Sequence, residues 1–219
     1  MKNIIITKKI WSKKNFDILK KNFLILSKVD LKKIKFSNPK VIFFIHWSKL
    51  ISSSVFNKYT CIQFHASNLP KGRGGSPIQN QILLGKKKTK LTAFQVSKNL
   101  DAGPICQQRN LSLKGNANQI FIRLEKTALL MIKKIISKKK LLFKSQKGSP
   151  SYFKRRNAKQ SLINFKKIKS FDKLYDFLRM LDADGYPNAY IKLNKSNLSF
   201  NSVKQDKNTI YANVQIKKR

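Results

Sequence analysis

Cys61-Ile62-Gln63-Phe64-His65-Ala66 is the stretch that says most about the fold, because this short apolar run is followed at once by a loop rich in Gly and Pro. Side chains alternate along a strand, so Gln63 and His65 share one face of it. His65 falls at the carboxyl end, where open α/β sheets bind their ligands. We therefore predict a strand over residues 60–66 with a candidate functional histidine at its end.

Apolar runs of strand length alternate with longer amphipathic runs on both sides of this strand. Residues 40–47 are apolar without alternation, as expected of a central parallel strand covered on both faces. Residues 118–138 carry apolar side chains at helical spacing and predict a long helix. This order of elements predicts an α/β fold with a Rossmann-like, mainly parallel open sheet. The other strands that we expect in it cover residues 3–6, 23–26, 89–96 and part of 103–113.

The sequence pattern changes after Lys138. Residues 171–181 are clearly amphipathic and predict a helix, and residues 189–193 and 209–216 predict strands. About 70 residues are too few for a second large domain. We therefore expect a catalytic domain over residues 1–145, followed by a linker and a small α+β annex over residues 146–219.

The charge of the chain is extreme, with 48 basic and 9 acidic residues and a net charge of +39. Such a charge favours polyanions, and non-specific polyanion binding at low salt is expected. However, 41 of the basic residues are lysine and only seven are arginine, whereas specific phosphate and base recognition relies on arginine. We interpret the lysines mainly as a compositional bias. A catalytically inactive basic fold that binds RNA stays as an alternative.

Several functional classes lack support in the sequence. Cys61 and Cys106 form neither a metal-binding spacing nor a disulfide framework, so no metal is expected. No run approaches the ~20 apolar residues that span a bilayer, and the N-terminal apolar stretch is too short for a secretory signal. With 41% hydrophobic residues, the chain is expected to fold as a cytoplasmic protein with a real core.

Two further segments carry candidate chemistry. Asp101 lies in a turn between apolar runs and is a candidate for orienting a histidine, although such an acid often only caps backbone amides. The glycine-rich residues 71–77 match no standard phosphate-binding motif and are weak evidence for an anion site. For His65 itself, the alternative is a structural histidine.

Together these segments resemble the folate-dependent formyltransferases, in which a strand ends in Asn-x-His-x-Ser-Leu-Leu-Pro and a later loop carries Leu-Asp-x-Gly. The corresponding residues here are Phe64-His65-Ala66-Ser67-Asn68-Leu69-Pro70-Lys71-Gly72-Arg73-Gly74-Gly75-Ser76-Pro77-Ile78-Gln79 and Leu100-Asp101-Ala102-Gly103-Pro104-Ile105. The family includes enzymes that formylate methionyl-tRNA, glycinamide ribonucleotide and amino sugars. The resemblance covers about residues 41–138.

The resemblance implies transfer of a formyl group from 10-formyltetrahydrofolate to an amine. His65 would match the family histidine that stabilises the tetrahedral intermediate and helps to move protons, and Asp101 the aspartate that orients it. The family asparagine, which would donate to the oxyanion, is replaced by Gln63, so Gln63 or Asn68 would supply the amide. The expected cofactor-binding residues are Ser67, Asn68, Leu69, Pro70, Leu100 and Gly103.

The tail of the chain resembles that of enzymes that formylate nucleotide-linked amino sugars for surface-glycan synthesis, in residues 152–156 and 177–187. We therefore expect an amino sugar, linked to a nucleotide, as acceptor and partner. The substrate-binding residues would be His46, Trp47, Arg73, Gly74, Lys154, Arg155 and Arg156, with Lys154 and the three arginines as charge-assisted donors to a diphosphate. The alternatives are methionyl-tRNA or glycinamide ribonucleotide as acceptor, and hydrolysis of 10-formyltetrahydrofolate. A homodimer is a further expectation.

Overall fold

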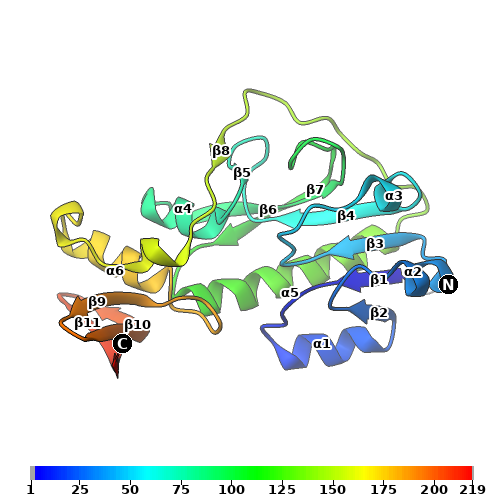
Figure 1. Cartoon of the computed structure of the whole chain (residues 1–219). Helices are drawn as coiled ribbons and strands as arrows, with labels where there is room; N and C mark the ends of the chain where they lie inside the picture. The colour runs from blue at the N-terminus through cyan, green and yellow to red at the C-terminus, as the bar shows by residue number, and fades with distance from the viewer. Residues whose placement is uncertain (1–2, 219) are drawn as a thin grey trace. The chain divides into compact units, whose positions relative to one another are not determined.

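The computed structural model describes residues 3–218, which form two compact units (Figure 1). The first unit comprises the chain up to Gly75 together with Thr89–Leu111 and Ile122–Phe153. The second unit comprises Ser76–Lys88, Ser112–Phe121 and the chain from Lys154 onwards. Because these units are defined by contacts and not by activity, the catalytic domain over residues 1–145 remains a prediction.

The first unit is built on a sheet that has six strands within residues 3–218, in the order β2-β1-β3-β4-β6-β7 (Figure 1). The neighbours β2, β1, β3 and β4 run parallel, whereas β6 runs antiparallel to β4. The predicted mainly parallel, Rossmann-like sheet is therefore confirmed. Its strands are β1 (Asn3–Ile6), β2 (Phe23–Leu26), β3 (Val41–Phe44), β4 (Thr60–His65), β6 (Lys88–Gln95) and β7 (Ile105–Ser112).

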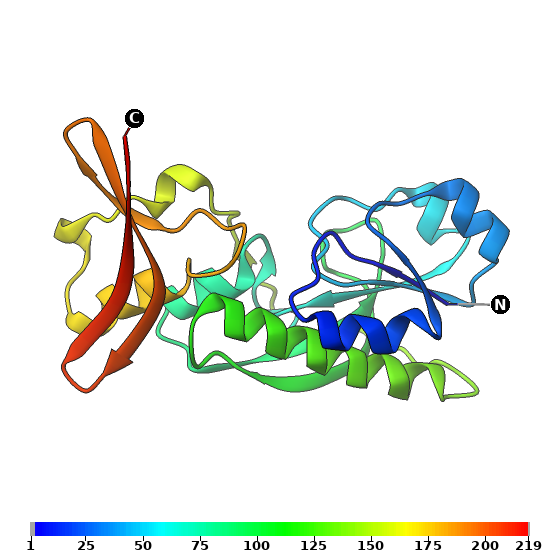
Figure 2. The same ribbon diagram turned by 90° about the horizontal axis from the view of Figure 1, so that it is seen from below.

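Helices cover both faces of this sheet (Figure 2). On one face, Ile42 and Phe44 pack with Ile34 of α2 (Leu31–Ser37) and Val55 of α3 (Ser53–Phe56). The opposite face lies against α1 (Lys13–Lys20) and α5 (Ala117–Ile136), which run side by side in Figures 1 and 2. All four residues of β3 are buried because the strand is covered on both sides, which accounts for its uninterrupted apolar sequence.

The first unit also contains a short pair of parallel strands that is separate from the main sheet. β5 (Arg73–Gly74) pairs with β8 (Tyr152–Phe153), so the glycine-rich loop lies beside a segment that follows about 80 residues later. The sequence pattern did not predict this pairing, because each strand has only two residues.

The second unit contains the predicted α+β annex. α6 (Phe171–Arg179) and the strands β9 (Ala189–Leu193) and β11 (Thr209–Lys218) lie close to the predicted ranges. Between them runs β10 (Ser196–Asp206), which the sequence did not predict, and the three strands form an antiparallel sheet in the order β11-β10-β9. The unit also contains α4 (Pro77–Leu83) and two short 3-10 helices, Ala158–Ser161 and Phe165–Lys167.

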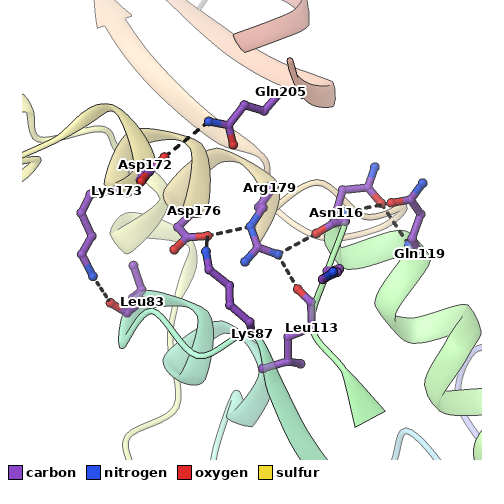
Figure 3. A network of polar contacts seen from close by, with 12 residues as sticks. Leu83, Lys87, Leu113, Asn116, Gln119, Asp172, Lys173, Asp176, Arg179 and Gln205 are labelled. Carbon is purple, nitrogen blue, oxygen red and sulfur yellow. Dashed lines mark hydrogen bonds and ion pairs between the residues drawn. The ribbon is translucent and has the colours of Figure 1, made fainter. Parts of the chain in front are cut away.

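A buried arginine ties α6 to the chain that enters α5 (Figure 3). Arg179 is only 2% exposed, and its Nε donates to Asp176 Oδ1 at 2.7 Å. Its Nη1 donates to the carbonyl oxygens of Leu113 and Gly115, each at 2.7 Å. A buried charge is tolerated only when it is paired and its hydrogen-bonding groups are satisfied, so this network fixes α6 within the unit.

Replacing this arginine should loosen the second unit. Arg179→Met keeps much of the side-chain volume but leaves two carbonyls without their donor and the Asp176 carboxylate with Lys87 at 3.8 Å as its remaining charged partner, a loss of about 3–5 kcal/mol. We expect faster hydrogen exchange at the amides of α6, with the amides of β3 in the first unit unchanged. Arg109→Met, at an exposed position, is the control and should leave both unaffected. Unchanged exchange in α6 would contradict the prediction.

Candidate active site

The candidate site of the first unit is centred on His65 at the carboxyl end of β4. His65 is 7% exposed, and its Nδ1 lies 3.6 Å from Oδ2 of Asp101, which is also 7% exposed. Asp101 comes from the loop between β6 and β7, and β6 is the neighbour of β4 in the sheet. The fold thus brings together two residues that are 36 positions apart (101 − 65) in the sequence.

The other nitrogen of His65 fixes the orientation of the ring. Its Nε2 is 2.8 Å from the carbonyl oxygen of Gly72. Since a carbonyl only accepts, Nε2 carries a hydrogen and donates it. The Nδ1 edge is therefore the one presented to the carboxylate of Asp101, and the ring cannot flip without losing the bond to Gly72.

Asp101 is held in turn by the glycine-rich loop. Its Oδ2 accepts the Gly74 N–H at 2.8 Å, and its own backbone has a positive φ of 48°. Gly74 has a φ of +95°, and a Cβ there would lie 2.5 Å from the carbonyl oxygen of Phe153. Only glycine fits this close approach, so Gly74 lets β5 run alongside β8 while it donates to Asp101.

The glycine-rich loop uses its backbone donors inside the protein. The N–H groups of residues 72 and 73 donate to the Oγ and the carbonyl oxygen of Ser151, and that of Gly75 donates to the carbonyl oxygen of Phe153. Together with the Gly74 bond, four consecutive N–H groups have internal acceptors. The loop is thus arranged to hold Asp101 and His65, and its N–H groups are not left open for an anion.

The side chain of Arg73 also contacts protein groups. Its guanidinium donates to the Gln146 side chain at 2.7 and 3.2 Å and lies 6.0 Å over the ring of Tyr152. Gln146 in turn donates to the carbonyls of Asp101 and Gly103. Sequence reasoning missed Gln146, and no motif around it could have identified it.

Two amide side chains lie near His65 in the sequence, Gln63 on β4 and Asn68 in the loop that follows β4. Gln63 is half-buried and lies two residues before His65 on the same face of β4. Asn68 is exposed, and its Oδ1 accepts from Gln108 Nε2 at 3.3 Å. Gln108 also donates to Thr92, whose hydroxyl donates to the carbonyl of Ser67. Gln63 and Asn68 both remain candidates for the amide that would donate to an oxyanion.

A buried hydroxyl in this loop has no internal partner. Ser67 is 1% exposed, and its Oγ makes no hydrogen bond to any group in the described part of the chain. Leu69 and Pro70, which follow it, are buried as well. Leu100 is half-exposed, and Gly103 approaches the carbonyl of Gln95 so closely that a Cβ would overlap it.

His46 and Trp47 follow β3, the parallel neighbour of β4. Trp47 is 9% exposed and packs in the core cluster against Phe44, which indicates a packing role. His46 has a φ of 51° and meets the ring of Trp11 edge-on at 6.0 Å. Burial, and to a smaller degree the charge of Lys9, lowers the pKa of His46 to about 4. His46 is therefore neutral at physiological pH.

The remaining predicted substrate residues, Lys154, Arg155 and Arg156, belong to the second unit. The carbonyl of Lys154 accepts from the side chain of Asn80, and Arg155 is exposed. The guanidinium of Arg156 donates to the carbonyl of Gln160 and lies over Phe177, and burial lowers the pKa of Arg156. Arg156 thus packs within its own unit.

The rest of the described chain adds no obvious reactive centre. Residues 3–218 contain no group of three or more His, Cys, Asp or Glu side chains placed to hold a metal ion. Cys61 and Cys106 are both free thiols, and burial raises the pKa of each. In the same part of the chain, no helix is long and apolar enough to cross a membrane.

An imidazole oriented beside a carboxylate, with amides and a buried hydroxyl nearby, suits proton transfer during acyl-group chemistry.

Comparison with known proteins is informative for both ends of the chain. The family model "Formyl transferase" matches residues 5–121, and the model "Methionyl-tRNA formyltransferase, C-terminal domain" matches residues 158–217. Methionyl-tRNA formyltransferase from Thermotoga neapolitana is 37% identical over 101 residues, which are 45% of this chain and 32% of that protein. The first curated relatives are thus matched over about a third of their length.

Solved structures extend the match to the whole chain. The structure of methionyl-tRNA formyltransferase from Clostridium thermocellum is 39% identical, has a TM-score of 0.92 and is covered over 100% of both chains. A sugar N-formyltransferase from Shewanella is 16% identical with a TM-score of 0.67, covering 89% of this chain and 93% of the other. The second likeness concerns the fold alone.

These comparisons correct the expected acceptor. The nucleotide-linked amino sugar, its role as partner and the link to surface-glycan synthesis were wrong, because the close relatives are named for methionyl-tRNA and the sugar enzymes are distant. The expectation rested on the tail, yet residues 158–217 match the C-terminal domain of the tRNA enzymes. The high net charge is also a feature expected of a protein that binds a polyanion, and interpreting the lysines as compositional bias set this feature aside.

The lowered pKa of His46 predicts a pH dependence of stability. Between its ordinary value of 6.5 and about 4, the unfolded chain binds a proton at His46 and the folded chain does not. The stabilisation is therefore complete above pH 6.5 and is lost as the pH falls towards 4, by about 3 kcal/mol. Asparagine tolerates a positive φ, so His46→Asn removes the titrating group with little backbone strain.

Urea unfolding at pH 7, 6, 5 and 4, followed by tryptophan fluorescence, checks this prediction. Trp11 and Trp47 both lie in the first unit and report on it. The variant should lose less stability than the wild type over this pH range, by about 3 kcal/mol. Parallel losses in the two proteins would show that His46 does not carry the effect.

Proposed function

The chain belongs to the formyl transferase family, and we propose that it transfers a formyl group from 10-formyltetrahydrofolate to the amino group of methionyl-tRNA. The observation that carries the proposal is the end-to-end similarity to a methionyl-tRNA formyltransferase, combined with the His65–Asp101 pair inside the family motif. Both parts are needed, since the fold alone serves several acceptors.

The site provides groups suited to the proton movement of this reaction. An amine that forms a bond to the formyl carbon must lose a proton, and the nitrogen that leaves must gain one. His65 is held by Gly72 and its Nδ1 faces the Asp101 carboxylate, so these two groups would take up the proton and pass it on. The amide of Gln63, on the same face of β4, would donate to the oxygen on which negative charge develops.

The loop after β4 suits a folate donor. 10-Formyltetrahydrofolate would supply the formyl group on a nitrogen that can leave. The Ser67 hydroxyl, buried and without an internal partner within residues 3–218, is the kind of group that a bound ligand satisfies. The apolar residues Leu69 and Pro70 follow it in the same loop, and Leu100 and Gly103 flank Asp101 in the loop between β6 and β7. The residues present therefore fit the donor.

The composition of the chain suits a tRNA acceptor. A net charge of +39 attracts a polyanion and makes its binding steeply dependent on salt, because bound phosphates release counterions. The positive charge of the protein would not strengthen the binding of an uncharged small acceptor. The lysines therefore support the same acceptor as the similarity does.

Removing either member of the central pair should abolish most of the activity. His65→Asn and Asp101→Asn should each lower kcat/KM for formyl transfer to methionyl-tRNA by about 10²–10⁴, because each removes a proton-transfer group. Formyl-methionyl-tRNA is measured by mass spectrometry after nuclease digestion. Asp206→Asn makes the same chemical change at an exposed position of β10 and should retain activity. Full activity in His65→Asn would contradict the assignment.

The acceptor is tested separately with the unmodified protein. Formyl transfer should require methionyl-tRNA, should not occur with free methionine at the same concentration, and should weaken as salt rises from 50 to 200 mM, by about 10³ or more if six or more phosphates are contacted. Binding of tRNA without any transfer would instead favour a catalytically inactive RNA-binding fold.

A further inference from the structure

Gln146 uses every hydrogen-bonding group of its side chain around the candidate site. Its Oε1 accepts from Nη2 and Nε of Arg73, at 2.7 and 3.2 Å. Its Nε2 donates to the carbonyl oxygens of Asp101 and Gly103, each at 2.8 Å. All of these residues belong to the first unit.

The chemistry of the partners determines which residue can occupy this position. A guanidinium only donates and a carbonyl only accepts, so the orientation of the Gln146 amide is unambiguous. The position requires an acceptor on one side and two donated hydrogens on the other. Glutamate lacks the donors, lysine lacks the acceptor, and an apolar residue lacks both.

These bonds close a ring of contacts around Asp101. The Gly74 N–H fixes the carboxylate of Asp101, the neighbouring Arg73 binds Gln146, and Gln146 fixes the backbone of Asp101. Asp101 has a positive φ of 48°, a conformation that costs free energy for a residue other than glycine. A held carbonyl on each side of Ala102 keeps the turn in that conformation.

We propose that Gln146 is a positioning residue, which holds the 101–103 turn so that the Asp101 carboxylate faces Nδ1 of His65. This rests on the proposed function for its kinetic consequence and on the geometry alone for its structural one. Gln146 itself acts only through Asp101. One side-chain amide thus supplies both hydrogen bonds to the carbonyls of the turn.

The test uses the fact that the chain contains only two histidines, His46 and His65. Labelling histidine with ¹⁵N gives two sets of imidazole signals, assigned with His46→Asn. Gln146→Glu keeps the acceptor for Arg73 but sets a carboxylate oxygen against two carbonyls. Gln146→Met removes all four hydrogen bonds at similar volume. Gln215→Glu, at an exposed position of β11, is the matched control for charge.

We expect the His65 signals to shift in both Gln146 variants, while those of His46 stay as in the wild type and Gln215→Glu changes neither. The kcat for formyl transfer should fall by about 10-fold to 10²-fold, since a small misplacement of a catalytic group has effects of that size. The KM for the formyl donor should change less than kcat, because four of the six expected donor-binding residues, Ser67, Asn68, Leu69 and Pro70, lie in the loop after β4 and outside the turn that Gln146 holds.

Three outcomes would overturn the proposal. Unchanged His65 signals in both variants would show that the turn does not need Gln146, whatever happens to kcat. A shift of His46 as large as that of His65 in both would show a general structural effect. Wild-type kcat in both would show that the turn is not limiting. Absence of formyl transfer in the wild-type protein would count against the proposed function only, since the signals of the two histidines still test the positioning.

Discussion

The candidate site depends on one interaction, which is the hydrogen bond that the buried carboxylate of Asp101 accepts from the glycine-rich loop. Its Oδ2 accepts the Gly74 N–H and lies 3.6 Å from His65 Nδ1. Gly74 makes this bond while it runs beside Phe153 of β8, so one residue both pairs with β8 and holds Asp101. The same loop presents the Gly72 carbonyl to His65. Packing and chemistry are therefore not separable here, because the same loop holds the carboxylate of Asp101 through Gly74 and orients the imidazole of His65 through Gly72.

How much of the fold could be predicted depended on the strength of each local signal. β3 and α5 were found because an uninterrupted apolar run and a long helical periodicity are strong local signals. α2 was missed because only one of its seven residues, Ile34, is buried. β10 was missed because its sequence is mostly polar, and its strand conformation depends on pairing with β9 and β11.

The site was predictable only where its residues belong to a motif. His65 and Asp101 could be named from the sequence, and the fold brings them together. Gln146 could not be named from the sequence, since its role depends on hydrogen bonds to the carbonyls of Asp101 and Gly103, which lie more than 40 residues earlier in the chain. The acceptor was misjudged for a different reason. A short tail offers few residues for comparison, and interpreting the lysine excess as a compositional bias left the high net charge out of the choice of acceptor.

The second unit is assembled from stretches that are far apart in the sequence, and this has a consequence for synthesis on the ribosome. The carbonyls of Leu113 and Gly115 have no Arg179 donor until that residue is synthesised, 66 and 64 residues later. β1, β2, β3 and β4 of the first unit lie within the first 65 residues and can pair early. The nascent chain therefore carries an unfinished second unit until Arg179 and the strands β9, β10 and β11 have emerged, and during this period it is most open to aggregation and to chaperones.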